Sequence, residues 1–205
     1  MTERECMEIV TSLNKCGINF LAIVSQYLHF NTFVVCCCLF SLLVRELQIN
    51  LLSSSKMYLQ DFDSTLISEH TCGHWRGTVP ELASKVRPFF RILVPLAIEH
   101  GILIAIVTFS GQTHVISSVL HHEFPSVADR ITIRAEDKSW VYQGGGSLEG
   151  KQSHMASAAD ELGDANGKTI TRNSTLLLDD DANNIRIALS NKVRAIRFIP
   201  ENIQK

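Results

Sequence analysis

The sequence predicts an α/β fold with a mostly parallel sheet that helices cover on both faces. From residue 57 onward, short apolar segments alternate with longer segments in which apolar residues recur at helical spacing. This alternation is typical of parallel sheets, because parallel strands need a long crossover, usually a helix, between them. In addition, acidic or hydroxyl residues directly follow several apolar segments, at the edge where ligands bind in such sheets.

The first predicted strand of this pattern, residues 57–60, leads directly into Asp61, and a helix over residues 80–100 follows. Residues 102–107, ILIAIV, are the clearest buried strand. The remaining elements alternate in the same way: helix 112–122, strand 130–134, helix 151–162, strand 175–178, helix 182–190 and strand 193–198. Ahead of the pattern, the sequence predicts two more elements: a helix over residues 2–15 and a buried strand over residues 18–23.

The composition is that of one globular domain spanning residues 1–205. Hydrophobic residues make up 45% of the chain and charged residues 20%. The net charge of −2 gives no reason to expect a nucleic-acid partner or an anionic membrane surface. Six cysteines are present without the spacing of a disulfide framework, which favours reduced thiols and a cytoplasmic protein.

Residues 24–60 form an anomalous apolar insertion. Within them, residues 27–44 approach the length that spans a bilayer, but polar residues such as His29 and Asn31 interrupt them. No basic segment leads into a short apolar core, so a cleaved signal peptide is not expected. A membrane anchor through residues 27–44 is left open as the alternative to a cytoplasmic protein.

A second explanation for residues 24–60 is that they are translated intron sequence. Joining residues 18–23 directly to Asp61 gives INFLAI-DFDSTLI, which is a more apolar strand than KMYLQ-DFDSTLI. Introns typically begin with GT and end with AG. The ends of this segment fit that pattern, because all codons of Val24 begin with GT and Gln60 can be encoded by CAG. The insertion is therefore either a retained intron or, if it is genuine, a membrane anchor.

The segment Asp61-Phe62-Asp63-Ser64-Thr65 follows the first strand and carries two carboxylates two positions apart. In an extended chain these side chains point to one side, where they can share a divalent cation. Asp61 can then act as a nucleophile, and Asp63 can protonate a leaving oxygen and later activate water. An acidic turn after a strand explains the same residues without any chemistry, so the motif needs support from elsewhere in the chain.

Two further segments predict phosphate-binding groups. Thr108 directly follows the strand ILIAIV, and the backbone N–H groups of Phe109 and Ser110, near a helix start, favour an anion. Ser110 also suits a helix cap, which is the structural alternative. Lys151 begins a helix, where the helix dipole disfavours a cation, so its charge is predicted to hold phosphate. A solvated lysine is the alternative.

A second acidic cluster, Asp179-Asp180-Asp181, follows another apolar strand. Three adjacent carboxylates repel one another unless solvent or a cation relieves them. Asp179 and Asp180 are therefore predicted to complete a metal site with Asp61 and Asp63, although an acidic helix N-terminus explains them as well. Carboxylate ligands of this kind suit Mg²⁺.

Together, these four motifs resemble those of the haloacid dehalogenase superfamily of phosphatases. The resemblance covers most of residues 57–198 and implies a Rossmann-like three-layer sandwich with a small flap after the first strand. It implies Asp61 as the nucleophile and Asp63 as the general acid/base. It also implies Thr108 and Lys151 as ligands of the phosphoryl group.

The same resemblance implies a Mg²⁺ site made by the carboxylates of Asp61, Asp179 and Asp180 together with the backbone carbonyl of Asp63. Dehalogenases of this superfamily generally lack the second Asp, because halide needs no protonation, so Asp63 favours phosphate-ester hydrolysis. The short spacers between the motifs imply a capless or minimally capped enzyme. An open site suits a bulky phosphorylated substrate, such as a phosphoprotein, or closure by another subunit of a homo-oligomer.

The sequence thus predicts a Mg²⁺-dependent phosphatase that works through an aspartyl-phosphate. A catalytically silent binding domain of the same fold is one alternative, and a membrane-anchored phosphatase is another. The silent domain is disfavoured because a binding module need not keep the full set of predicted catalytic residues: Asp61, Asp63, Thr108, Lys151 and Asp180.

Overall fold

The computed structural model describes residues 55–142 and 146–199. These residues lie within one compact unit of the chain, Gln48–Lys205. The predictions for residues 2–15, 18–23 and 27–44 fall outside the described residues.

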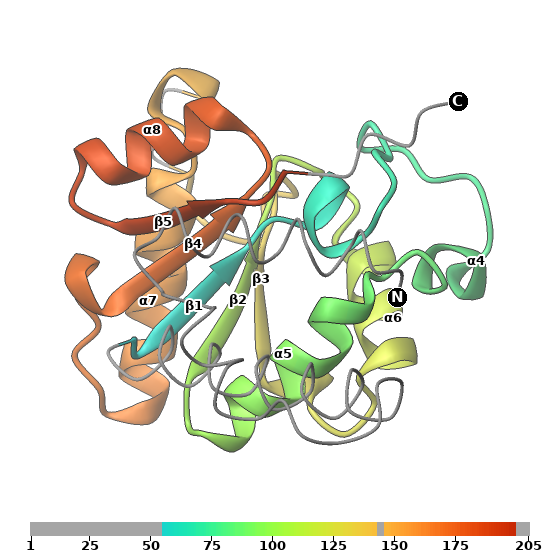
Figure 1. The fold of residues 1–205 in the computed structure, drawn as a ribbon, viewed down its shortest axis with the longest axis horizontal. Helices are drawn as coiled ribbons and strands as arrows, with labels where there is room; N and C mark the ends of the chain where they lie inside the picture. Colours follow the sequence, from blue (N-terminus) through green and yellow to red (C-terminus); the bar gives the residue numbers. More distant parts are fainter. Residues whose placement is uncertain (1–54, 143–145, 200–205) are drawn as a thin grey trace, which may run out of the picture. The chain divides into compact units, whose positions relative to one another are not determined.

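A five-stranded sheet forms the centre of the fold (Figure 1), and all of its strands are parallel. β1 (Met57–Gln60) lies in the middle, with β2 (Leu103–Val107) and then β3 (Ile131–Arg134) on one side and β4 (Thr175–Asp179) and then β5 (Arg194–Arg197) on the other. The chain fills one side of β1 before it crosses to the other, so the strand order reverses between β1 and β4. In open α/β sheets, ligands bind outside the carboxyl ends of the strands at this point.

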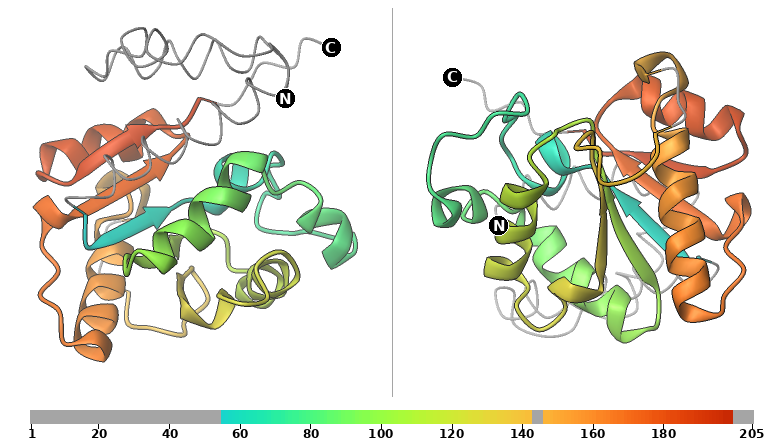
Figure 2. Two further views of the ribbon diagram at one scale, coloured as in Figure 1. Left: turned by 60° about the horizontal axis from the view of Figure 1, so that its bottom comes forward. Right: turned by 180° about the vertical axis from the view of Figure 1, so that it is seen from behind.

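Helices cover both faces of the sheet (Figures 1 and 2). α5 (Pro88–Glu99) and α6 (Thr113–Glu123) pack against one face, in a core cluster that contains Tyr58 of β1. α7 (Gln152–Asn166) and α8 (Ala182–Ser190) pack against the other face. The expected Rossmann-like three-layer sandwich with a parallel sheet is therefore confirmed. Three short helical turns complete the connections: η2 (Ala128–Arg130), η3 (Gly146–Glu149) and η4 (Arg172–Ser174).

The prediction of one helix over residues 80–100 is wrong, because the structure has two helices there. α4 (Val79–Ala83) begins after Thr78, which caps it in a capping box. α5 begins at Pro88, and Arg87 before it is extended, with a φ of −70° and a ψ of 141°. Proline disfavours the α conformation at the preceding residue, so a single helix cannot run through Arg87.

A small flap follows β1. The chain leaves β1 through one wide helical turn, η1 (Phe62–Leu66), in which Ser64 has a φ of 57°. The flap continues over residues 67–78, and Ile67 pairs antiparallel with Val86 at its base. Apart from this flap and the short α4, the described residues contain no separate cap domain between the motifs.

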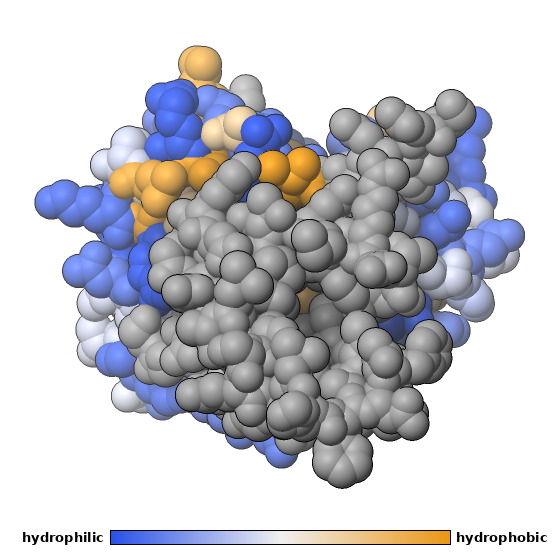
Figure 3. Space-filling model, in the orientation of Figure 1, coloured by the Kyte–Doolittle hydropathy of each residue, from blue (hydrophilic) through white to orange (hydrophobic). Residues whose placement is uncertain are grey.

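The face of the molecule in Figure 3 is mostly hydrophilic where residues are described, and hydrophobic residues gather over α8 and β5. Leu189 of α8 is 54% exposed. Within residues 55–142 and 146–199, no helix is both long enough and apolar enough to cross a membrane. The predicted homo-oligomer stays a prediction.

Candidate active site

The carboxyl edge of the sheet brings together residues from distant parts of the chain. Asp61 directly follows β1, Thr108 directly follows β2, and Asp179 is the last residue of β4. Because β1 pairs with both β2 and β4, these three positions are neighbours along one edge. Lys151 immediately precedes α7 and reaches this edge as well.

Lys151 is the centre of the site. Its side chain is 1% exposed, and its Nζ lies 2.6 Å from Asp61 Oδ1 and 2.7 Å from Asp179 Oδ2. One buried amine thus joins two carboxylates that come from neighbouring strands. Burial of a charge is tolerated when the charge is paired in this way. The alternative of a solvated lysine is therefore wrong.

The protonation of this cluster is governed by burial and by its own charges. Burial raises the pKa of Asp61 to about 7, although the Lys151 charge lowers it and the Asp179 charge raises it further. For Lys151, burial disfavours the charged form, but the attraction of Asp61 and Asp179 outweighs it and holds the pKa above its ordinary value. Lys151 is therefore cationic at neutral pH. Another positive charge beside Asp61 would lower the pKa of that carboxyl and favour its ionised form.

The two oxygens of Asp61 have different surroundings. Oδ1 accepts a hydrogen bond from the Phe62 backbone N–H at 2.7 Å and makes the ion pair with Lys151. Oδ2 makes no hydrogen bond to the residues that the structure describes. One oxygen is thus anchored, while the other is available to a ligand or a reacting atom.

Asp61, Asp179 and Asp180 form a group that can hold a metal ion, because one carboxylate oxygen from each lies within 4.8 Å of the others. The Thr65 hydroxyl donates to Asp180 Oδ1 at 3.2 Å and accepts from the Asp180 backbone N–H at 3.1 Å. The Asn184 amide donates to both oxygens of Asp179, at 3.2 and 3.1 Å. Burial and the Asp179 charge raise the pKa of Asp180, as expected where carboxylates crowd together.

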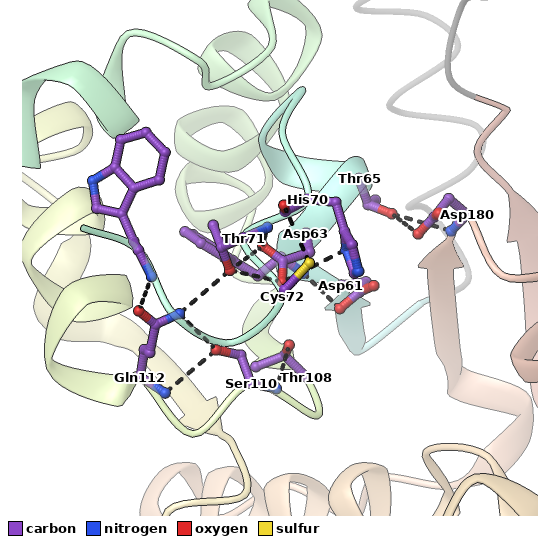
Figure 4. Close-up of polar contacts among 12 residues, drawn as sticks. Asp61, Asp63, Thr65, His70, Thr71, Cys72, Thr108, Ser110, Gln112 and Asp180 are labelled. Atoms are coloured by element: carbon purple, nitrogen blue, oxygen red, sulfur yellow. Dashed lines mark hydrogen bonds and ion pairs between the residues drawn. The ribbon is translucent and has the colours of Figure 1, made fainter. Parts of the chain in front are cut away.

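Asp63 is not part of that carboxylate group among the described residues, because its side chain is held by the flap (Figure 4). Thr71 Oγ1 lies 2.9 Å from each Asp63 oxygen, and the Thr71 backbone N–H donates to Oδ1 at 3.2 Å. His70 Nδ1 lies 3.9 Å from Asp63 Oδ2. The expected sharing of a cation by the Asp61 and Asp63 side chains therefore finds no support in the described residues. The predicted contact of the Asp63 backbone carbonyl with a metal stays a prediction.

Thr108, Phe109 and Ser110 lie in the loop between β2 and α6. Thr108 is 2% exposed, and its Oγ1 accepts a hydrogen bond from the Ser110 backbone N–H at 3.2 Å. Ser110 Oγ accepts from the backbone N–H of Gln112, the residue that precedes α6, so Ser110 supports the helix start without being its N-cap. The Phe109 ring centroid lies 5.7 Å from Lys151 Nζ. The loop therefore lies beside Lys151, and its contacts with phosphate stay predictions.

Four side chains that hold this site in place are absent from the sequence-based predictions: Thr65, Thr71, Gln112 and Asn184. Thr65 belongs to the first acidic motif and Asn184 follows the second, so their spacing from the aspartates was a usable signal. Thr71 and Gln112 are 41 positions apart and bond to each other across the flap, and no local pattern links them.

His154 is fully buried and has no hydrogen-bond partner among the described residues. Its ring packs against the rings of Phe109, Trp140 and Tyr142, whose centroids lie 5.2, 4.9 and 5.3 Å away. Burial and the Lys151 charge lower the pKa of His154 to about 4. The imidazole is therefore neutral in the folded protein at neutral pH.

This lowered pKa predicts a pH-dependent stability. Between about pH 6.5 and pH 4 the unfolded chain binds the proton and the folded chain does not, so acidification across this window destabilises the fold. We expect the contribution of His154 to the free energy of unfolding to fall by up to about 3 kcal/mol across it. The variant His154→Phe should lose this contribution, as measured by urea unfolding at a series of pH values. The exposed His114→Asn variant is the control. A pH dependence that is the same in His154→Phe and in the wild type contradicts the assignment.

No family model and no curated protein matches this chain. Solved structures that are similar to it include an uncharacterized protein from Corynebacterium glutamicum, with 16% identity over 70% of this chain and 84% of that chain and a TM-score of 0.41. They also include the HAD domain of the effector protein Lem4 from Legionella pneumophila, an inactive mutant, with 13% identity over 73% of this chain and 88% of that chain and a TM-score of 0.41. At these values neither structure supports a function for this chain, so the function is inferred from the site itself.

Proposed function

We propose that the protein is a Mg²⁺-dependent phosphomonoester hydrolase that works through an aspartyl-phosphate at Asp61. The observation that carries this proposal is the buried Lys151 amine, 2.6 Å from Asp61 and 2.7 Å from Asp179 at the carboxyl edge of the sheet. An ion pair with a purely structural role would not require a third carboxylate, that of Asp180, beside it. It would also not require an Asp61 oxygen that makes no hydrogen bond to the described residues.

The acidic group fits Mg²⁺ in its donor atoms. Three carboxylates offer oxygens within 4.8 Å of one another, and Mg²⁺ takes oxygen ligands, of which one or two are carboxylates and the rest are water and phosphate oxygens. We assign Asp61 and Asp180 to it, with Asp179 beside them and the backbone carbonyl of Asp63. When bound, Mg²⁺ supplies a positive charge that stabilises the phosphate oxygens and reduces their repulsion by the carboxylates.

In the first step, Asp61 Oδ2 attacks the phosphorus of a phosphomonoester. The bond from phosphorus to the leaving oxygen breaks, and Asp63 gives that oxygen a proton. Lys151 and Thr108 hold the phosphoryl oxygens, and the backbone N–H groups of Phe109 and Ser110 assist them. In the second step, water attacks the phosphorus of the aspartyl-phosphate while Asp63 takes its proton. Inorganic phosphate leaves and the Asp61 carboxylate is restored.

Phosphate release from an aryl phosphate, measured with Mg²⁺ and with EDTA, tests the proposal. We expect release in the presence of Mg²⁺ and its loss on chelation, because the crowded carboxylates repel an anionic substrate without the cation. A panel of phosphopeptides, nucleotides and sugar phosphates then ranks the substrates. If the folded protein releases phosphate from none of them with Mg²⁺ present, the proposal is wrong and a silent binding domain is favoured.

The variant Asp63→Asn is expected to separate the two chemical steps. An aryl phosphate with a good leaving group needs little protonation, so Asp61 is still phosphorylated. Hydrolysis of the aspartyl-phosphate then slows by about 10²–10⁴-fold, because asparagine cannot take a proton from water. Rapid-quench kinetics should show a burst of the phenol, close to one equivalent per active site, followed by slow turnover. Fast turnover without a burst would show that Asp63 is not the base.

We further propose a bulky substrate, such as a phosphoprotein, and a cytoplasmic setting. Apart from the flap and α4, the described residues include no cap domain that would enclose a small ligand. We expect a higher kcat/KM for a phosphoprotein than for the free phosphoamino acid, measured with the same preparation. A preference for the small compound contradicts this part of the proposal.

A further inference from the structure

The side chain of Gln112 joins the flap to the start of α6 (Figure 4). Its Oε1 accepts a hydrogen bond from the Trp75 backbone N–H, and its Nε2 donates to Thr71 Oγ1 at 3.3 Å and to Ser110 Oγ at 3.4 Å. One amide thus bonds to both ends of the flap turn, in which Gly73 has a φ of 68°. This role needs a side chain that accepts at one atom and donates at another, which an amide provides.

Thr71 transmits this constraint to Asp63. A hydroxyl has one proton, and Thr71 Oγ1 already accepts from Gln112 Nε2, so its proton is directed to Asp63. Both Asp63 oxygens lie 2.9 Å from Thr71 Oγ1, and the Thr71 backbone N–H adds a further bond at 3.2 Å. The flap therefore sets the orientation of the Asp63 carboxylate, and Gln112 sets the position of the flap.

We propose that Gln112 is a positioning residue that fixes the flap and thereby orients Asp63 for proton transfer. Gln112 bonds to neither Asp61 nor Lys151 within the described residues, so it acts through Thr71. The catalytic half of this proposal rests on the proposed function, in which Asp63 is the general acid/base. The structural half, that Gln112 fixes the flap, does not rest on the proposed function and can be tested alone.

Amide hydrogen exchange tests the structural half. The variant Gln112→Met keeps the length of the side chain and loses all three hydrogen bonds. The variant Gln112→Glu keeps an acceptor for Trp75 and loses the donor to Thr71. We expect the Trp75 backbone amide to exchange about tenfold faster in Gln112→Met and close to the wild-type rate in Gln112→Glu. An unchanged rate in Gln112→Met overturns the proposal.

Steady-state kinetics test the catalytic half. Because the change affects the geometry of proton transfer and not substrate binding, we expect kcat to fall about tenfold in both variants, with KM within about twofold of the wild type. A raised KM with unchanged kcat, or faster exchange with unchanged kcat, overturns the positioning role. If the wild-type protein has no phosphatase activity but the Trp75 amide exchanges faster in Gln112→Met, the structural half is supported and the proposed function is wrong.

A separate anomaly lies in the central strand. Tyr58 and Gln60 of β1 are 0% exposed, yet neither the Tyr58 hydroxyl nor the polar atoms of the Gln60 amide have a hydrogen-bond partner among the described residues. Burial raises the pKa of Tyr58 well above its ordinary value, and nothing offsets it. Buried polar groups without partners are rare in folded proteins, because each has lost its hydrogen bonds to water.

The surroundings of both side chains are apolar. Side chains two positions apart share a face of the sheet, so Tyr58 and Gln60 face the same core cluster. Their partners in register on the two neighbouring strands are all aliphatic: Ile104, Ile106, Leu176 and Leu178. This environment favours aliphatic residues at both positions of the central strand.

The chain contains a segment that meets this requirement. If residues 24–60 are removed, residues 18–23 stand directly before Asp61, with Leu21 in the position of Tyr58 and Ile23 in the position of Gln60. Both unpaired polar side chains are then replaced by aliphatic ones. The removed segment is also the one whose ends fit intron boundaries. We infer that residues 24–60 are absent from the functional chain, so that Ile23 directly precedes Asp61 in its sequence.

Thermal unfolding of the 205-residue chain and of the chain without residues 24–60 tests this inference. We expect the shorter chain to unfold at a midpoint higher by about 5 °C or more, because three buried polar atoms no longer lack partners. A lower midpoint, or a shorter chain that does not fold, overturns the inference.

A substitution in the full chain gives a second test. Gln60→Ile should raise the unfolding midpoint by about 3 °C, whereas Leu59→Ile, a swap of equal volume on the opposite face, should not raise it. A lower midpoint in Gln60→Ile overturns the inference. Transcript sequences that join the codons of Ile23 and Asp61 support it, and transcripts and peptides that all retain residues 24–60 overturn it.

Discussion

Replacing Asp61 with asparagine is expected to lower kcat for phosphate release by about 10⁴-fold or more. The amide keeps the size of the side chain but removes the nucleophilic oxygen, and the nucleophile has no substitute among the described carboxylates. Asp179 is fully buried and bonded to Asn184, and Asp180 is held by Thr65. Initial rates with an aryl phosphate and Mg²⁺ measure the effect.

Asp181→Asn is the matched control for this substitution. Asp181 lies in the same acidic cluster, but its side chain caps α8 by accepting from the Asn183 and Asn184 backbone N–H groups. Asparagine caps helices about as well as aspartate, so the fold should be unaffected. We expect kcat within about threefold of the wild type, since Asp181 is outside the metal-capable group. Equal activity of Asp61→Asn and Asp181→Asn would contradict the assignment of the nucleophile.

Replacing Lys151 with methionine is expected to reduce both stability and activity. The variant leaves Asp61 and Asp179 buried and facing each other without the amine that joins them. Removal of one partner from a buried ion pair typically destabilises a protein by about 3–5 kcal/mol. For a domain of this size that corresponds to an unfolding midpoint lower by about 6–20 °C. Mg²⁺ should recover part of the loss, because the carboxylates are then free to bind it.

A double-mutant cycle separates this electrostatic effect from lost packing. The double variant Asp61→Asn/Lys151→Met lacks one of the two uncompensated carboxylates. The free energy of unfolding that the double variant loses should therefore be smaller, by about 2 kcal/mol, than the sum of the losses in the two single variants. Lys168→Met is the control, because Lys168 is exposed and its amine donates to the Gly101 backbone carbonyl and to no carboxylate among the described residues. Additive losses, or a Lys151→Met variant as stable as Lys168→Met, would show that the buried ion pair does not hold the site together.

The layered fold was predictable because its signals are local. Alternating apolar strands and periodic helices predict a parallel sheet covered on both faces, and the observed elements follow the predicted order from Met57 to Arg197. The break between α4 and α5 was also encoded locally, by Pro88, although apolar periodicity continues across it. Which strands are neighbours is decided by packing over the whole chain, so the reversal of strand order between β1 and β4 was not predictable in the same way.

In the candidate site, too, the local signals were predictable and the long-range contacts were not. The acidic residues at strand ends could be picked out because each directly follows an apolar run, and the sheet brings Asp61 and Asp179 together through Lys151. The pairing of Thr71 with Gln112 could not be found, since it depends on how a flap folds back over a loop 41 positions away. The Gln60 side chain, which has no hydrogen-bond partner in the described part of the chain, adds structural support to the sequence-based hypothesis that residues 24–60 are translated intron sequence.

Chemical trapping during turnover tests the covalent account most directly. The protein is mixed with Mg²⁺ and substrate and quenched in acid, and the acyl phosphate is reduced with borohydride before peptide mass spectrometry. We expect the peptide that contains residue 61 to carry the reduced product in the wild type, and to lack it in Asp61→Asn and in samples with EDTA. Turnover with phosphate trapped on another side chain, or with no covalent species in wild type and in the slowly hydrolysing Asp63→Asn variant, would contradict it.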